Sequence, residues 1–423
     1  MKKLLVIQVA GLGHAFALRN GLETLAGMVL QPMQSGFPAV TCTAQATLRT
    51  GLPVAEHGMV ANGLFDTAFC KPRFWEQSAT LVHGARIWDA FRARGGTVGL
   101  FFFQQSLGES VDCVLSPAPI HTHGGGLIMG CYAQPPALEV QFQRAAGRPF
   151  KLHHYWGPLA SVKASTWIAD ALSCYVADAQ APDLIFGYLP GLDYDLQRFG
   201  PDHPKSQRAM RTTQRDLEKL VAAARKNGYD VVVFGDYAIT PVTRAPVYLN
   251  RALRAAGLMQ VRMLKGMAYP DFYTSRAFAV VDHQVATIHC ADSTACAAAR
   301  RCLETLPGVA EVWAATELAA HQLDHPHSGA LMAVAEAGTW FAYPWWCEKA
   351  EAPDYACHVD IHNKPGFDPC ELFFGRMPFH VSMDATRIKG THGRVETTAF
   401  ASTLGVAPHD LNALAQTLKN WLS

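Results

Sequence analysis

Short apolar runs alternate along the chain with longer segments of helical periodicity. Four runs predict buried strands: LLVIQV at 4–9, TVGLFFF at 97–103, DLIFGYL at 183–189 and DVVVFG at 230–235. The stretch SQRAMRTTQRDLEKLVAAARKNG, ending at Gly228, predicts an amphipathic helix, because its apolar residues recur every three or four positions. Strands and helices that alternate in this way predict an α/β fold with a mostly parallel sheet covered on both faces.

Two segments interrupt this rhythm. Residues 104–165 are rich in Gly, Pro, His and Gln and are too long for a plain connection, so we expect an excursion beside the carboxyl edge of the sheet. Between about 270 and 335 the patterns of a β-hairpin, a helix and a strand follow one another. We therefore predict a core made of residues 1–265 and 336–423, and a small inserted α+β cap at 266–335.

Composition narrows the class of protein. Of the 423 residues, 49% are hydrophobic and 17% charged, which is typical of a globular chain. Net charge is +1, from 36 basic and 35 acidic residues, which argues against nucleic acid or an anionic membrane as partner. The eleven cysteines include no CxxC pair, which favours reduced thiols. Because 4–9 is better explained as a strand than as a signal peptide, we expect a cytoplasmic protein. Nothing in the sequence predicts an oligomeric state.

Polar residues follow several predicted strands. Ligands of an open α/β sheet lie beyond the carboxyl ends of its strands. Asp193 and Asp236 come there, and His392 lies in the Gly-flanked segment KGTHGR. Thr41 opens a predicted helix, whose free N–H groups suit a phosphate.

The segment TCTAQATLRTGLPVAEHGM, which begins at Thr41, carries a family resemblance. It resembles the nucleophile segment of type I phosphodiesterases and nucleotide pyrophosphatases in the alkaline phosphatase superfamily, and the order of motifs is similar over nearly the whole chain. The resemblance implies Thr41 as nucleophile, a helix end at Thr50-Gly51 and a closing His57-Gly58 pair. It also implies an alkaline-phosphatase-like three-layer sandwich with the small cap inserted.

That family holds two metal ions, usually zinc, and the resemblance implies which positions bind them. The first site uses an Asp, a His four residues later and a late His; the second uses an Asp after the first strand, the nucleophile and an Asp-His pair. Here three of these positions hold other residues, namely Ala10, Gln197 and Tyr237. The implied ligands that remain are Thr41, Asp193, Asp236 and His392.

Two carboxylates, a threonine and one imidazole can still hold one divalent ion, for which oxygen ligands favour Mg²⁺ or Mn²⁺ over zinc. We therefore expect one or two ions, zinc or Mn²⁺/Mg²⁺. Arg198 or Arg49 could supply the missing positive charge. Gln45, Gln197 and Tyr237 are candidates to contact a phosphoryl oxygen.

Other histidines could refill the metal site. His121 and His123 lie within the 104–165 excursion. His358, Asp360 and His362 alternate with apolar residues before Pro365-Gly366, which predicts a strand and turn with the three polar side chains on one side.

Two hypotheses follow for the function. The first is a metal-dependent hydrolase of a phosphodiester, a phosphomonoester or a nucleotide pyrophosphate, in which Thr41 attacks phosphorus and a phosphothreonine is then hydrolysed. Its partner would be a small phosphorylated substrate. The alternative is a non-catalytic family member that binds a phosphorylated or aromatic metabolite, or a phosphoryl transferase. Metal content and the effect of Thr41→Ala distinguish a hydrolase from a binding protein.

Overall fold

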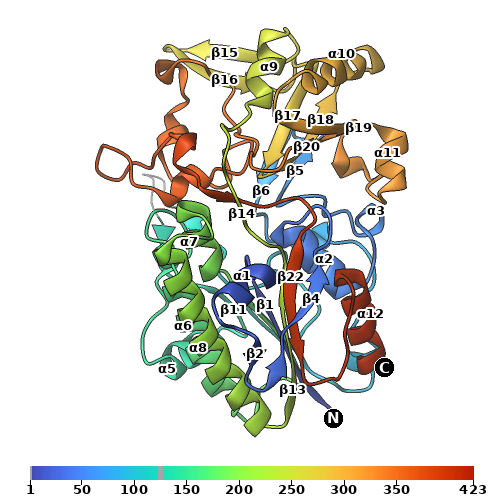
Figure 1. The fold of residues 1–423 in the computed structure, drawn as a ribbon, viewed down its shortest axis with the longest axis vertical. Coiled ribbons are helices and arrows are strands. Elements are labelled where there is room, and N and C mark those ends of the chain that lie inside the picture. Colours follow the sequence, from blue (N-terminus) through green and yellow to red (C-terminus); the bar gives the residue numbers. More distant parts are fainter. Residues whose placement is uncertain (1, 122–126) are drawn as a thin grey trace.

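An eight-stranded sheet forms the centre of the lower half of the protein in the computed structural model, which describes residues 2–121 and 127–423 (Figure 1). Five neighbouring strands, β8, β7, β12, β1 and β13, run parallel to one another. The remaining strands, β11, β22 and β4, each pair antiparallel with a neighbour. The four predicted strands are confirmed as β7, β12, β1 and β13, which are contiguous. Across the sheet the order is β11 (Tyr132–Gln134), β8 (Cys113–Ser116), β7 (Val98–Phe101), β12 (Leu184–Leu189), β1 (Lys3–Val9), β13 (Tyr229–Gly235), β22 (Thr397–Ser402) and β4 (Gln31–Gln34).

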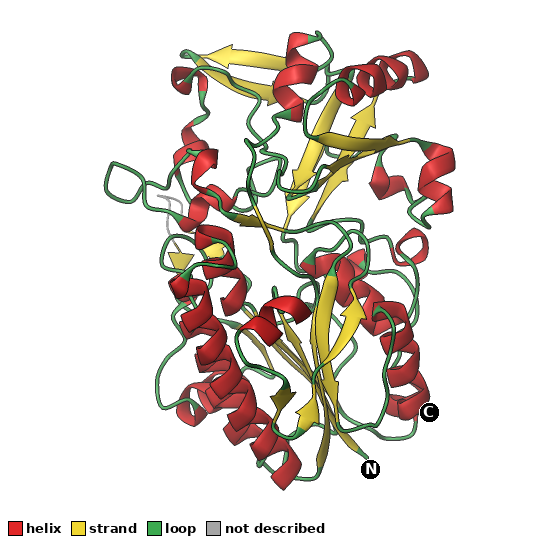
Figure 2. Ribbon diagram, in the orientation of Figure 1, coloured by secondary structure: helices red, strands yellow, loops and turns green. Residues whose placement is uncertain are grey.

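Helices cover both faces of this sheet and complete three layers (Figure 2). One face carries α5 (Ala137–Ala145), α6 (Lys163–Tyr175), α7 (Gly191–Phe199) and α8 (Pro204–Lys226); the other carries α2 (Thr41–Thr50) and α12 (Leu411–Leu422). The predicted amphipathic helix is α8, and it stops just before Gly228, whose φ is +79°.

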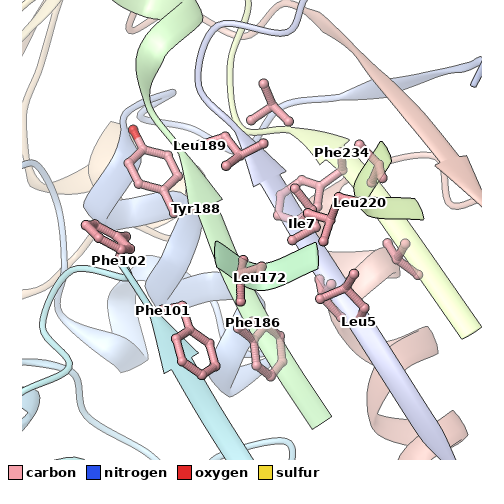
Figure 3. Packing of buried hydrophobic residues seen from close by; sticks show 14 of the residues in the cluster. Leu5, Ile7, Phe101, Phe102, Leu172, Phe186, Tyr188, Leu189, Leu220 and Phe234 are labelled. Atoms are coloured by element: carbon pink, nitrogen blue, oxygen red, sulfur yellow. The ribbon is translucent and has the colours of Figure 1, made fainter. Parts of the chain in front are cut away.

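The core lies between the sheet and its helices. Leu5 and Ile7 of β1 are fully buried and lie beside Phe186 of β12, with Leu172 of α6 and Leu220 of α8 packed over them (Figure 3). Because β1 has neighbours on both sides and helices on both faces, its sequence is a continuous apolar run rather than an alternating one.

A second, antiparallel sheet forms the upper half of the molecule in Figure 1. The expected hairpin, helix and strand are present as β17, β18, α10 and β19. This sheet has its own buried hydrophobic cluster, which also takes in residues from 42–82 and 341–361. The elements here are α9 (Leu249–Ala255), β15 (Gln260–Leu264), β16 (Met267–Asp271), β17 (Ala277–Asp282), β18 (Val285–Cys290), α10 (Ser293–Glu304), β19 (Val309–Trp313), α11 (Ala315–Ala320) and β20 (Leu331–Ala335).

The segment 104–165 is more than an excursion. Residues 113–116 and 132–134 within it become β8 and β11 and extend the main sheet at one edge. The short apolar run CVLS is enough for a strand once β7 offers a free edge, but the Gly, Pro and His residues around it dominate the sequence pattern. His121 belongs to β9, whereas His123 lies outside the described residues.

Residues 336–389 return from the upper sheet along the junction of the two halves, in short 3₁₀ turns. Among the described residues, no helix is both long and apolar enough to cross a membrane. The remaining short elements are α1 (His14–Arg19), β2 (Thr24–Leu25), β3 (Met28–Val29), α3 (Val54–His57), β5 (Gly63–Asp66), β6 (Lys71–Phe74), η1 (Ala79–Leu81), α4 (Asp89–Ala93), β9 (Ile120–His121), β10 (Leu127–Ile128), η2 (Leu152–His154), β14 (Thr240–Pro241), η3 (Pro326–Ser328), η4 (Lys349–Glu351), η5 (Asp354–Cys357), η6 (Pro369–Leu372), η7 (Ala385–Arg387) and β21 (Gly390–Thr391).

Candidate functional site

A pocket lies at the carboxyl edge of the main sheet, where that sheet faces the upper half of the molecule. The space between its lining atoms, open solvent included, amounts to about 800 Å³. Phe, Trp and Tyr side chains make up eight of its 23 lining residues, and its polar residues come from both halves and from the returning segment 336–389. Its lining includes Thr41, Asn62, Trp75, Tyr155, Trp156, Tyr188, Asp193, Tyr194, Gln197, Tyr237, His283, Lys364, Phe367, Asp368, Glu371 and His392.

Thr41 is the first residue of α2 and faces the pocket, with 3% of its surface exposed. The helix it opens ends at Thr50, and Gly51 follows with φ +67°, a left-handed cap that favours glycine. The hydroxyl of Thr41 lies 3.2 Å from that of Tyr188. One of the free N–H groups at this helix start is already used, because the amide of Cys42 donates to Asn62 Oδ1 at 3.0 Å.

Asp193 lies in the first turn of α7, just beyond the end of β12, and both of its carboxylate oxygens accept hydrogen bonds. Gln197 Nε2 donates to one oxygen at 2.6 Å, and the Tyr237 hydroxyl donates to the other at 3.1 Å. Both donors stand at positions where the family resemblance implies a histidine. Burial raises the pKa of Asp193 to about 7, although these two donors act in the opposite direction.

Asp236 follows β13 directly, and its carboxylate is also fully engaged. Gln8 Nε2 donates to Oδ2 at 2.7 Å, while the backbone amides of Gly11 and Tyr237 donate to Oδ1 at 3.3 and 3.0 Å. Burial, reinforced by the charge of Asp193, raises the pKa of Asp236 to about 8. Gln8 comes from β1 and was not predicted as a site residue; the available signal was a lone polar residue inside a buried strand.

His392 stands in a stack of four rings. Tyr237 lies parallel to it with centroids 3.6 Å apart, and His283 lies tilted against it at 3.7 Å. Phe367 in turn stacks on His283 with centroids 4.0 Å apart. The Nδ1 of His392 donates to the carbonyl oxygen of Ala39 at 2.7 Å. Burial lowers the pKa of His392 well below its usual value, so the ring is neutral.

Asp282 and His283 form a second polar unit that the sequence reasoning missed. Asp282 ends β17 and accepts bonds from the backbone and side-chain nitrogens of Asn62, at 2.7 and 3.2 Å. It also lies 2.7 Å from His283 Nδ1. His283 has φ +57°, which is unusual outside glycine and often marks a functional site. Burial lowers its pKa to about 3, and its buried Nε2 has no partner among the described residues.

Two residues predicted to contact substrate are used elsewhere in the structure. Gln45 lies inside α2, where its Oε1 accepts from the amide of Gln104. Arg198 donates to the carbonyl oxygens of Leu372, Ala160 and Pro158 and so ties α7 to its surroundings. Neither residue lines the pocket, whereas Gln197 and Tyr237 do. Arg49 is fully buried and bonds to the carbonyl of Gln105.

His358, Asp360 and His362 do not form the predicted strand. The segment follows η5 as irregular chain and turns, so the alternation of side chains is lost. Asp360 accepts bonds from the backbone and side chain of Asn363, and His362 Nδ1 lies 3.0 Å from the carbonyl oxygen of Phe74. His358 lies instead near Cys357 and His380.

Lys364 carries the positive charge of the pocket. Among the described lining residues it is the only lysine or arginine, and 1% of its side chain is exposed. It lies 2.8 Å from Asp368 and 2.7 Å from Glu371. Burial alone would lower the pKa of Lys364, but these two carboxylates hold it above its usual value. The cation is therefore fully paired.

The two-ion centre implied by the resemblance does not fit these residues. A metal ligand needs a free lone pair directed at the ion, but the oxygens of Asp193 and Asp236 face the side-chain donors of Gln197, Tyr237 and Gln8. These donors direct hydrogen atoms at the carboxylate oxygens, where a metal ion would otherwise supply positive charge. The ring of Tyr237 also covers the face of His392. Each of these carboxylate oxygens therefore already gives a lone pair to a neutral donor.

The free energy of unfolding is expected to fall as the pH rises from about 5 to 8. In the folded chain, burial raises the pKa of Asp193 to about 7 and that of Asp236 to about 8, from 3.8. The folded state therefore holds protons that the unfolded state has released, so this stabilisation is complete below about pH 4 and is lost as the pH rises through the folded pKa values. Urea unfolding at several pH values measures the slope.

Asp236→Asn should remove up to about 1.4 kcal/mol per pH unit from that slope, because the amide cannot titrate. Asp202→Asn is the matched control, since the side chain of Asp202 is 75% exposed. A slope unchanged in Asp236→Asn would show that Asp236 is ionised in the folded chain at neutral pH.

Solved structures with the same fold include two enzymes of known name. The first is phosphonoacetate hydrolase from Sinorhizobium meliloti in complex with phosphonoformate, with TM-score 0.66, 15% identity, and coverage of 100% of this chain and 96% of that chain. The second is murine ectonucleotide pyrophosphatase/phosphodiesterase 5, with TM-score 0.61, 15% identity, and coverage of 100% and 95%. An inactive variant of the murine protein has been solved with AMP. A comparison with curated proteins finds no match.

These likenesses establish the alkaline-phosphatase-like fold, a three-layer sandwich with a mostly parallel sheet and a small α+β cap. The family model described as type I phosphodiesterase / nucleotide pyrophosphatase matches residues 12–368. Members of this family generally depend on divalent metal ions, and the match supports phosphodiesterase- or pyrophosphatase-like chemistry on phosphoryl groups. The chain therefore belongs to the type I phosphodiesterase / nucleotide pyrophosphatase family.

Proposed function

We propose that this chain is a ligand-binding member of its family. Its pocket would take a small molecule that carries an aromatic ring and hydrogen-bond donors, without two-metal hydrolysis. The observation that supports this most directly is the pairing of Asp193 with Gln197 and Tyr237, and of Asp236 with Gln8. An ion at these carboxylates would compete with all three donors.

The charge of the pocket argues against a phosphorylated ligand. Without metal ions, a phosphate group would be placed near Asp193, Asp368 and Glu371. Lys364, the one lysine or arginine among the described lining residues, already pairs with two of these carboxylates, and His283 and His392 are neutral. Burying an anion beside carboxylates without an available cation is unfavourable, since neither solvent nor a counter-charge compensates it.

The unpartnered polar atoms of the pocket accept hydrogen bonds. Gln197 Oε1 and His283 Nε2 are buried, line the pocket region and have no partner among the described residues. A carbonyl oxygen and the bare nitrogen of a neutral imidazole both require a donor, such as a hydroxyl or an amine. A ligand with such donors would remove the cost of leaving these two acceptors unsatisfied, whereas a phosphate offers mainly acceptors.

Aromatic walls would hold the rest of the ligand. Trp75 and Trp156 meet edge to face with ring centroids 5.6 Å apart, and Phe367 lies 6.2 Å from Trp75. Such surfaces stack well on flat groups and give large contact area with little loss of side-chain entropy. The proposed ligand is therefore aromatic, uncharged or cationic, and rich in hydroxyl or amino groups.

Matched pairs of aromatic compounds test this proposal. Adenosine with AMP, and 4-nitrophenol with 4-nitrophenyl phosphate, differ only in the phosphoryl group. In each pair we expect the member without phosphate to bind at least about tenfold more tightly in calorimetric titrations at about pH 6, where 4-nitrophenol is uncharged. Tighter binding of AMP or 4-nitrophenyl phosphate, or their turnover by the metal-supplemented chain, would contradict the proposal.

The second candidate function is Thr41-dependent hydrolysis of phosphoryl esters, the chemistry of the family. It is favoured by the place of Thr41 at the start of α2, facing the pocket. The Thr41→Ala variant separates the two functions. A binding protein should keep its affinity for the uncharged compounds within about threefold, because a single hydroxyl contributes little to stacking. A hydrolase should lose activity on bis(4-nitrophenyl) phosphate.

A further inference from the structure

Cys357, His358 and His380 lie together at the surface, and none of the three lines the pocket. The Cys357 sulfur and one ring nitrogen of each histidine all lie within 4.8 Å of one another. The two imidazole rings meet edge to face with centroids 5.0 Å apart. In a tetrahedral zinc site neighbouring ligand atoms are about 3.3–3.7 Å apart, given bonds of about 2.0–2.3 Å, so small side-chain rotations suffice to close the site.

The backbone holds the two contributing segments in place. Cys357 is the last residue of η5, and His380 belongs to the loop that follows η6. The amide of Val381 donates to the carbonyl of Cys357 at 2.8 Å, and the amide of Gly375 donates to the carbonyl of His380 at 2.8 Å. The ligand atoms are therefore brought together by a hydrogen-bonded framework.

The two imidazoles are available as ligands. Among the described residues, neither His358 nor His380 makes a side-chain hydrogen bond, in contrast to His392 and His283. His358 is exposed, and Cys357 and His380 are half-buried, so an ion can enter from solvent. The Cys357 thiol makes only a 3.4 Å contact to the carbonyl of Asp354, which loss of its proton would release.

We propose that Cys357, His358 and His380 form a zinc site. One thiolate and two neutral imidazoles suit zinc, which is borderline soft and prefers N and S ligands in tetrahedral geometry. Binding releases the thiol proton to solvent, forms one Zn–S and two Zn–N bonds, and leaves the fourth position to water.

The site would stabilise one wall of the pocket. Its ligands lie on either side of residues 361–372, from which Ile361, Lys364 and Glu371 line the pocket. A zinc ion would cross-link the two ends of this segment. The inference does not depend on the proposed function, because the cluster shares no residue with the pocket lining.

The test uses the full chain, purified without an affinity-tag metal, stripped with chelator and then titrated with Zn²⁺ and Co²⁺. We expect one zinc per chain with a Kd below about 1 µM. Co²⁺ should give a thiolate-to-metal charge-transfer band, which reports the bond to Cys357. Cys357→Ser should abolish that band. His380→Ala should raise the Kd for zinc by more than about 100-fold, because loss of a residue that only orients a ligand typically costs about 10–100-fold in metal affinity.

Cys174→Ser and His409→Ala are matched controls, because both side chains are exposed and lie outside the cluster. Both should keep the stoichiometry and the cobalt band. Zinc that persists in a Cys357→Ser/His380→Ala double variant would overturn the proposal, as would a natural chain that binds no zinc. Zinc lost on changing Asp236→Asn but kept in Cys357→Ser would overturn it too, and would place the ion in the pocket.

Discussion

A chain that carries Ala10→Asp, Gln197→His and Tyr237→His together is expected to bind zinc in the pocket at least about a hundredfold more tightly than the natural chain. The three changes remove the donors that Gln197 and Tyr237 present to Asp193. They supply a carboxylate and two imidazoles at positions where the family resemblance implies ligands. Asp193, Asp236 and His392 are already in place.

Without metal, the triple variant should be less stable than the natural chain. Ala10 is fully buried, so the introduced Asp would add a third carboxylate close to two that are already difficult to ionise. Zinc should reverse this loss, since binding only to the folded state stabilises it by mass action. In a His358→Ala background, which removes the proposed surface zinc site, the thermal midpoint of the triple variant should therefore rise steeply with zinc. The midpoint of the His358→Ala chain without the three changes should not.

Two measures isolate the pocket in this experiment. A His358→Ala background removes the proposed surface site, so that any remaining tight zinc belongs to the pocket. In the same His358→Ala background, a Gln197→Leu/Tyr237→Phe variant removes the same donors without adding ligands, and its pocket should stay free of tight zinc. Metal content and chelator competition give the measurement. Tight pocket zinc in the natural chain with His358→Ala would show that the hydrogen bonds yield to an ion, and would favour the hydrolase.

Local patterns predicted the centre of the fold. The four strands predicted from apolar runs are the contiguous parallel strands at the centre of the sheet. They could be predicted because a strand buried on both faces has an almost continuous run of apolar residues. The same reasoning placed Thr41, Asp193 and Asp236 at the carboxyl edge, and the family resemblance implied His392 as a further ligand. All of these except Asp236 line the pocket. Strand β8 was missed because it has only four residues, too few to show a clear hydrophobic pattern, and it is held as a strand by its pairing with β7.

Contacts between distant segments could not be predicted in this way. Asn62 and Asp282 are 220 positions apart, and Gln8 and Asp236 are 228 apart, so neither pair leaves a spacing to read. The sequence showed that ligands were missing at Ala10, Gln197 and Tyr237. It could not show that Gln197 and Tyr237 turn their donors onto the same carboxylate, which is what argues for a metal-free pocket.

Lys364→Met should destabilise the chain by about 3–5 kcal/mol at pH 8, the range expected when one partner of a buried ion pair is removed. The side chain of Lys364 is 1% exposed and lies between Asp368 and Glu371. Methionine fills a similar volume, so the loss would come from two buried carboxylates without a counter-charge rather than from a cavity. Burial already raises the pKa of Glu371, even with the lysine present.

The deficit of Lys364→Met should shrink as the pH falls towards 5. Without the lysine, the pKa of Glu371, which burial already raises, rises further in the folded chain. The folded state then takes up a proton before the unfolded state does, so stability returns at low pH. The triple variant Lys364→Met/Asp368→Asn/Glu371→Gln is the matched control. It leaves no charge to compensate and should recover most of the loss at pH 8, because a neutral polar cluster avoids the desolvation of unpaired charge.

Urea unfolding of the three proteins at pH 5 and pH 8 measures both effects. A deficit equal at both pH values and retained by the triple variant would mean that Lys364 acts through packing alone. The pocket would then lack the paired charge that underlies its discrimination against anions.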